Sequence, residues 1–398
     1  MAPSLLRPTD GAPHATALSR SLIALEQDAT LIAVIEMGQS SWLVAGVVPG
    51  VERQPLKKLA VDQAGLLQLL HRWRNEAVRA GCSIKRIAVA YEAGRDGFWL
   101  ARWLRAHGIE AYVIHASSVP VSREHRRAKT DRLDTELLKR AFLGWLRGEP
   151  NHCSMAAIPT LEDEDAKRPS RERESLVREC TRIVNRVKGN LARLGIRGFK
   201  VSLAHAAERL GALRTPEGAT VPPNTLAELR RDMAHLRFVK QQIKEIEAAR
   251  AERLEQGSAQ GRNGMVRLLA RVVGVGIESA DMLVQEVFSR ELRDRRAVAR
   301  YAGLTGAPDE SGKKRRERGL AKAGNARVRR GMIQLAWGHL LHQKDSVLAE
   351  WYRRRTADAR GGTRKTMIVA LARKLLIALW RLVTTGEAPV GLLLRPAT

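Results

Sequence analysis

Apolar residues in the first 150 positions alternate between short unbroken runs and longer helical patterns. Residues 31–35, 41–48, 84–91 and 111–115 form apolar runs of strand length. Residues 62–80, 96–107 and 130–146 show the spacing of amphipathic helices. Two strands in succession, followed by alternating helices and strands, predict an α/β domain with a mixed sheet over residues 29–150. A leader rich in Pro, Ala, Ser and Thr precedes it at residues 1–28.

The rest of the chain has a helical pattern almost throughout. In the middle region, residues 151–262, three- and four-residue steps connect the apolar positions Leu226, Leu229, Met233, Leu236, Val239, Ile243 and Ile246. Such a seam predicts a coiled-coil-like contact with a partner helix, from the same chain or from another subunit. Beyond a Gly- and Ser-containing linker, residues 263–398 are predicted to form a compact, mainly helical domain. The expected fold class is therefore α/β plus all-α.

The charge balance points to a polyanionic partner. Lys and Arg number 69 against 42 Asp and Glu, which gives a formal net charge of +27. Nucleic acid is the usual partner of such a chain, because phosphate neutralisation releases condensed counterions. No signal-peptide pattern is present, and charged residues interrupt the longest apolar runs, so no membrane partner is expected. Three cysteines without metal-type spacing fit a reducing cytoplasm. The expected location is the bacterial cytoplasm, in association with nucleoid DNA.

Four carboxylates follow the predicted elements of the first domain. Glu36 closes the first strand, Glu92 closes the third, and Asp131 and Asp134 share one face at the start of a helix. Carboxylates ~4 Å apart repel by on the order of 4 kcal/mol at an effective dielectric near 20. Mg²⁺ or Mn²⁺ would relieve that repulsion, and two such ions support in-line displacement at phosphate. Helix capping and strand-end turns remain the alternative explanation for these residues.

A second group of candidate residues lies in the last domain. Residues 273–280 resemble a helix-hairpin-helix turn, in which Gly274 and Gly276 would let backbone N–H groups approach a phosphate, although a plain interhelical turn explains them too. Between Ser311 and Arg330, nine of twenty residues are basic and only Glu317 is acidic. These predicted phosphate-binding residues are Lys313, Lys314, Arg315, Arg316, Arg318, Lys322, Arg327, Arg329 and Arg330. Ser311 sits beside a glycine within the run, and by its chemistry alone it fits a turn residue better than a nucleophile.

The motifs together resemble the DEDD insertion-sequence transposases, the IS110/IS1111 family that includes pilin-gene invertases. The residues that carry the resemblance are Ile35-Glu36, Tyr91-Glu92-Ala93-Gly94, Lys129-Thr130-Asp131-Arg132-Leu133-Asp134, Val273-Gly274-Val275-Gly276, Ala302-Gly303-Leu304-Thr305, Ser311-Gly312 and Lys322-Ala323-Gly324-Asn325. The resemblance covers roughly residues 31–379, nearly the whole chain. One position departs from the pattern, because the first carboxylate of the family is usually Asp and here is Glu36.

The resemblance implies a fold and a chemistry. The first domain would be RuvC-like, of the ribonuclease-H type, and would bind Mg²⁺ through Glu36, Glu92, Asp131 and Asp134. Ser311, at the position of the family's nucleophile, would attack DNA and form a phosphoserine link. The partners would be donor and target DNA and a structured bridge RNA encoded by the element. The chain would act as a homodimer that assembles into a tetramer.

Two other functions are compatible with part of this pattern. A structure-selective nuclease of the Holliday-junction type would use the carboxylates and would not need Ser311. A non-catalytic nucleic-acid-binding protein would favour basic residues at the four carboxylate positions, so the intact carboxylates speak against it.

Overall fold

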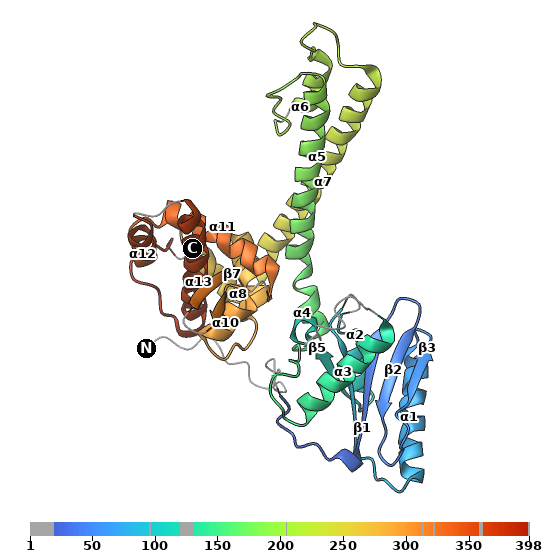
Figure 1. Cartoon of the computed structure of the whole chain (residues 1–398). Coiled ribbons are helices and arrows are strands. Elements are labelled where there is room, and N and C mark those ends of the chain that lie inside the picture. Colours follow the sequence, from blue (N-terminus) through green and yellow to red (C-terminus); the bar gives the residue numbers. More distant parts are fainter. Residues whose placement is uncertain are drawn as a thin grey trace. The chain divides into compact units, whose positions relative to one another are not determined.

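The computed structural model of the chain describes residues 20–94, 97–119, 130–203, 205–311, 314–320, 323–357 and 361–396 (Figure 1). These residues form two compact units, one up to Glu162 and the other comprising nearly all residues from Asp163 onward. The elements of the first unit are η1 (Gln27–Ala29), β1 (Thr30–Met37), β2 (Trp42–Val47), β3 (Leu56–Leu59), α1 (Gln63–Arg79), β4 (Arg86–Glu92), α2 (Trp99–Ala106), β5 (Glu110–Ile114), η2 (Ala116–Ser118) and α3 (Asp131–Leu146).

The second unit contains the remaining elements, after α4 (Leu161–Asp165) at the junction. They are α5 (Arg168–Arg193), α6 (Ala206–Arg209), η3 (Leu210–Ala212), α7 (Pro223–Gln256), α8 (Gly261–Ala270), α9 (Ile277–Leu283), η4 (Val284–Phe288), α10 (Arg295–Tyr301), β6 (Gly306–Ser311), β7 (Lys314–Leu320), α11 (Ala326–His342), α12 (Val347–Thr356) and α13 (Gly361–Thr385). The predicted fold class, an α/β domain followed by a mainly helical region, is confirmed. The predicted boundaries at 28, 150 and 262 stay predictions.

The first unit is built on a mixed five-stranded sheet of order β3-β2-β1-β4-β5. β1 pairs antiparallel with β2, as expected for two successive strands, and parallel with β4, which itself runs parallel to β5. The strand order brings the carboxyl ends of β1 and β4 side by side. This is the ribonuclease-H-like arrangement that the sequence motifs predicted.

Helices cover both faces of this sheet. Leu31 and Ile35 of β1 face a core shared with α1 and α2, whereas Ile32 and Val34 face a second core formed largely by α3. Successive side chains of a strand point to opposite faces, which explains why β1 is apolar throughout. The central strands β1 and β4 are therefore buried on both sides, and their charged residues are confined to the strand ends.

The second unit begins with a long antiparallel hairpin of α5 and α7. Arg186 of α5 forms an ion pair with Asp232 of α7, and the side-chain amide of Asn190 donates a hydrogen bond to Glu228 at 3.0 Å. The predicted seam of α7 packs on the apolar side of α5, including Ile183, Val187 and Leu191. The partner helix of the seam thus comes from the same chain, as one of the two predicted alternatives had it.

The C-terminal helices pack around α13, which contacts α8, α10, α11 and α12. Buried leucines from Leu371 to Leu382 form its inner side. One element here was not predicted, the two-stranded β6-β7 hairpin, whose strands are largely charged. In the part of the chain that the structure describes, no helix is long and apolar enough to cross a membrane.

Candidate functional site

Glu36 and Glu92 lie at the same edge of the sheet, at the carboxyl ends of neighbouring parallel strands. The register pairs Ile35 of β1 with Tyr91 of β4. Glu36 and Glu92 are the next residues of the two strands, so they lie at the same level of the sheet. Side chains alternate between the two faces of a strand, and Glu36 and Glu92 each lie two residues after one that faces α3, Val34 and Ala90. Both carboxylates are therefore placed on the α3 side of the sheet.

Helix α3 brings the two aspartates toward this edge. Its C-terminal turns pack through Phe142 and Trp145 on Tyr112, with ring centroids 5.5 and 5.1 Å apart. The Tyr112 hydroxyl meets Glu110 and Arg86 at the opposite end of the strands, because those residues begin β5 and β4. α3 therefore runs back along the sheet, and its first turn lies toward the carboxyl ends of β1 and β4.

The start of α3 is defined by a cap. The Thr130 side chain accepts a hydrogen bond from the Leu133 amide at 3.3 Å. Asp131 and Asp134 follow in the first turn, where negative charge is favoured by the helix dipole. Asp131 is exposed and Asp134 is half-buried. Thr130 thus caps the helix, so neither aspartate is needed as the cap residue and both could bind a metal ion.

The four carboxylates do not form a closed cluster. Within the described ranges, no group of three or more His, Cys, Asp or Glu side chains is close enough together to hold a metal ion. The donor set nonetheless suits a hard divalent cation, because all four residues offer carboxylate oxygens. The structure brings Glu36 and Glu92 to adjacent strand ends and leaves the two aspartates on a separate helix that is directed to the same edge.

Ser311 occupies the turn end of the β6-β7 hairpin. It is the last residue of β6 and pairs with Lys314, the first residue of β7. The register also places Asp309 opposite Arg316 and Glu310 opposite Arg315. The cationic run is therefore a strand from Lys314 to Leu320, an element that the sequence pattern did not predict. Lys313 and Lys322 lie outside the described residues.

The base of this hairpin is closed by two glycines. Gly303 and Gly324 both have positive φ angles, 65° and 87°. A Cβ at Gly324 would lie 2.5 Å from the Arg300 carbonyl oxygen and 2.7 Å from the Gly303 amide nitrogen. Only glycine permits this backbone and this approach. The motifs before and after the hairpin, Ala302-Gly303-Leu304-Thr305 and Lys322-Ala323-Gly324-Asn325, are thus in contact through Gly303 and Gly324.

Asn325 continues this closure into α11. Its side chain caps the helix by accepting from the amides of Arg327 and Val328, at 3.1 and 3.3 Å. Its own amide donates to the Tyr301 carbonyl at 2.6 Å, and its side-chain amide donates to Glu286 at 3.1 Å. One residue therefore joins the hairpin base, the start of α11 and a buried carboxylate.

That carboxylate, Glu286, is the residue that sequence reasoning missed. It lies in the π-helical turn η4 with only 2% of its side chain exposed, and it accepts two hydrogen bonds from Arg171 of α5, at 2.8 and 3.1 Å. Burial alone would raise the pKa of Glu286, but the hydrogen bonds and charge of Arg171 hold it below its usual range. Its signal was a single acid within the apolar run 282–288, which is typical of a buried, paired charge.

Glu286→Gln is expected to destabilise the second unit by about 1.5–3 kcal/mol, because a charged hydrogen-bond acceptor for Arg171 is lost. The difference from wild type should be largest near neutral pH. It should fade as the pH falls through the lowered pKa of Glu286, where the wild-type carboxyl also becomes neutral. Denaturant unfolding at several pH values measures this.

Glu255→Gln provides the control, since Glu255 is exposed on α7. It should leave stability within about 0.5 kcal/mol of wild type. A Glu286→Gln protein as stable as the Glu255→Gln control at pH 7 would show that Glu286 does not support the hairpin base.

The arginines of α11 are engaged with the protein to different degrees. Arg327 pairs with Glu174 at 2.6 Å and donates to the Ser170 carbonyl, with 17% of its side chain exposed. Arg330 also pairs with Glu174 but remains 55% exposed, and Arg329 donates to a loop carbonyl. Arg330 and Arg329 are accordingly better placed than Arg327 to meet a phosphate.

The glycine turn before α9 has a structural explanation. Gly274 has a φ of 91° and packs on His342. The neighbouring Val273 amide donates to the Leu393 carbonyl, and buried Gln343 bridges Val273 and Leu393 through both ends of its side chain. Gly276 precedes α9 as its cap residue. The turn is thus tied to the C-terminal segment, which favours the plain interhelical alternative.

Comparison with known proteins identifies both halves of the chain. Residues 51–196 match the DEDD transposase domain of IS110 elements, and residues 266–353 match the family described as transposase IS116/IS110/IS902. The first range contains Glu92, Asp131 and Asp134, and the second contains Ser311. Glu36 lies before the first range. A DEDD domain of this kind implies catalysis with divalent metal ions.

Two relatives carry transposase names. A protein named as transposase y4rJ, from Sinorhizobium fredii, is 39% identical over 371 residues, which cover 91% of this chain and 93% of the relative. A protein named as a family 20 transposase, from Pseudomonas aeruginosa, is 28% identical over 242 residues, covering 58% of this chain and 67% of that protein. Together with the ribonuclease-H-like sheet and the helical second unit, these matches show that the chain belongs to the IS110 family of transposases, DNA-binding enzymes of phosphoryl transfer.

Proposed function

We propose that the chain is a site-specific DNA recombinase with two chemical centres, the carboxylate edge of the first unit and Ser311 of the second. The observation that carries this proposal is the placement of Glu36 and Glu92 at adjacent strand ends, with the aspartate-bearing end of α3 directed to the same edge. Capping of α3 is done by Thr130, so Asp131 and Asp134 are not needed for it. A metal site explains their accumulation.

Glu36, Glu92, Asp131 and Asp134 would hold Mg²⁺ or Mn²⁺ in this proposal. A bound divalent ion would neutralise charge on the phosphate under attack. Glu36 replaces the shorter aspartate that is usual in the family, and its longer side chain can still supply a carboxylate oxygen. By holding the ions, the four side chains would position the scissile phosphate.

Ser311 would act as the nucleophile. Its hydroxyl oxygen would form a bond to phosphorus while the bond to one sugar oxygen breaks, and that oxygen would leave with a proton as a free hydroxyl. Attack by a hydroxyl of another DNA end on the phosphoserine would then restore the serine and a DNA phosphodiester. Each step exchanges one phosphate ester for another, so no nucleotide cofactor is needed. Arginine and lysine residues of the hairpin would stabilise the charge that develops on the phosphate.

A structured bridge RNA and a homodimer that assembles into a tetramer complete the proposal, in the bacterial cytoplasm on nucleoid DNA. Both rest on the family resemblance, and the RNA partner is also supported by the formal net charge of +27. Sequencing the RNA that copurifies with the protein from cells carrying its element tests the RNA partner. One discrete structured transcript is expected, and only fragments of abundant cellular RNA would contradict the bridge RNA.

DNA binding should depend steeply on salt through the β6-β7 hairpin. Neutralising Arg315 and Arg316 to Gln should lower the slope of log K against log salt concentration by up to about one unit per lost phosphate contact. The exposed pair Lys57 and Lys58 on β3 provides the control, with the same change of charge in the other unit. Fluorescence anisotropy with duplex DNA over a salt series measures the slope. Equal slopes for the hairpin variant and wild type would mean that the hairpin faces solvent in the complex.

A further inference from the structure

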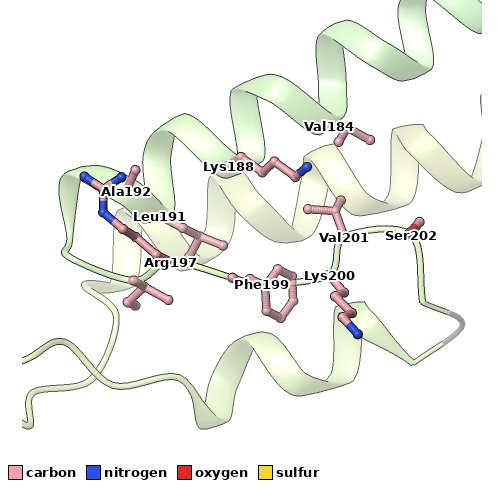
Figure 2. A pocket seen from close by; sticks show the side chains of 11 residues that line it. Val184, Lys188, Leu191, Ala192, Arg197, Phe199, Lys200, Val201 and Ser202 are labelled. Atoms are coloured by element: carbon pink, nitrogen blue, oxygen red, sulfur yellow. The ribbon is translucent and has the colours of Figure 1, made fainter.

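A cavity lies at the far end of the α5-α7 hairpin from the C-terminal helices. It has a volume of about 440 Å³ and is formed where residues 196–202 fold back along the last turns of α5. Figure 2 shows its lining, with Lys188 reaching in from α5 and Arg197, Phe199 and Lys200 coming from the returning segment. This volume falls within the ~300–1,000 Å³ typical of sites for small molecules.

The lining combines an apolar floor with a cationic rim. Leu191 is buried and Val184 is half-buried beneath the cavity, and Phe199 packs partly on the same hydrophobic core. Lys188, Arg197 and Lys200 are exposed. Among the residues that the structure describes, no carboxylate forms an ion pair with any of these three cations. Their positive charge is therefore available to a ligand.

The segment around the cavity, residues 182–214, has a strong excess of positive charge. Residues 182–214 contain one acid, Glu208, and eight basic residues: Arg182, Arg186, Lys188, Arg193, Arg197, Lys200, Arg209 and Arg214. Of these, Arg186 is paired with Asp232 of α7. A coiled-coil surface that only needed to be soluble would mix charges of both signs, as α7 does.

We propose that this cavity binds an unpaired nucleotide of a single-stranded polynucleotide. The base would stack on Phe199 over the apolar floor, and the flanking phosphates would meet Lys188, Arg197 and Lys200. An aromatic ring surrounded by cations suits a single strand, because a duplex keeps the faces of its bases stacked inside. A free inorganic anion would leave the apolar floor unused. The site is independent of the four carboxylates and of Ser311.

Binding of short single strands by the full-length protein tests this site. The probes are a fluorescent 12-nucleotide oligouridylate, the matching oligodeoxythymidylate and a DNA duplex. Phe199→Leu keeps an apolar side chain on the core but loses the ring, and it should weaken single-strand binding by about 5- to 100-fold. Phe199→Tyr should restore it. Phe238→Leu is the control, since Phe238 is 63% exposed on α7 away from the cavity.

The cations provide a second comparison. Each of Lys188→Gln, Arg197→Gln and Lys200→Gln should lower the salt slope for single strands by about 0.7, whereas Lys244→Gln on exposed α7 surface should not. A loss for oligouridylate alone would identify RNA as the ligand, a loss for oligodeoxythymidylate alone would identify DNA, and a loss for both would identify the shared single-strand chemistry.

Photocrosslinking tests the site on the wild-type protein and therefore does not depend on whether a variant folds. An oligonucleotide with 4-thiouridine or 5-iodouracil should crosslink to residues 198–200 of the wild-type protein. Crosslinks that map elsewhere would overturn the proposal. So would a Phe199→Leu protein that binds single strands as wild type does, or one that loses duplex binding to the same extent.

Discussion

Replacing Ser311 by alanine is expected to abolish recombination, by at least about 10³-fold, while DNA binding stays within about twofold of wild type. The loss is large because the hydroxyl oxygen forms the covalent bond in the proposed mechanism. Affinity is retained because the hydroxyl adds little beside the basic residues of the hairpin. A plasmid recombination assay and anisotropy measure the two quantities.

Ser279 and Ser289 provide matched controls in the same unit. Ser279 lies on α9, and Ser289 follows η4 with its hydroxyl donating to the Gln285 carbonyl. Alanine at either position should leave recombination within a few-fold of wild type. Normal recombination by Ser311→Ala would assign strand cleavage to the carboxylate edge alone, as in a structure-selective nuclease.

Asp131→Asn and Asp134→Asn are each expected to reduce recombination by at least about 100-fold, because a neutral amide is a poor ligand for a hard divalent cation. Both residues belong to the first turn of α3, whose cap is Thr130, so the helix should persist. Circular dichroism and the melting temperature check that it does. Recombination is then measured over a series of Mg²⁺ and Mn²⁺ concentrations.

A change of metal separates ligation from a structural role. Asp134→Cys should be inactive with Mg²⁺ and partly restored by Mn²⁺, since a thiolate is accepted more readily by the softer ion. Glu76→Gln on the exposed surface of α1 is the control and should respond to both metals as wild type does. Full recombination by Asp134→Asn would remove this residue from the metal site.

Much of the first unit follows from local sequence pattern. Strands β1, β2 and β4 could be predicted from their apolar runs, because a strand buried on both faces is apolar at nearly every position. Helix α3 could be predicted from its helical spacing of apolar residues. β3 was missed because Leu56-Lys57-Lys58-Leu59 is an edge strand with three exposed residues. The adjacency of Glu36 and Glu92 depends on β1 pairing with β4 across about fifty residues, which strand-end positions suggest but do not specify.

The second unit was predicted less completely. The seam of α7 identified a coiled-coil contact, but the choice between α5 and another subunit required the fold. The β6-β7 hairpin has charged rather than apolar alternation, so nothing in its pattern distinguishes it from a cationic loop. The contact between Gly303 and Gly324 and the pairing of Glu286 with Arg171 join residues far apart in sequence, and only tertiary structure brings them together.

Mapping the covalent intermediate tests the central claim most directly. Stalled reactions of the wild-type protein with a nicked or mismatched DNA substrate are digested with trypsin and nuclease and examined by mass spectrometry. Cleavage after Arg300 and Lys313 releases a peptide in which Ser311 is the only serine. The account predicts that the nucleotide remnant lies on this peptide, at Ser311, and that Ser311→Ala yields none. A remnant on any other residue, or stalled reactions without a covalent adduct, would contradict a serine recombinase.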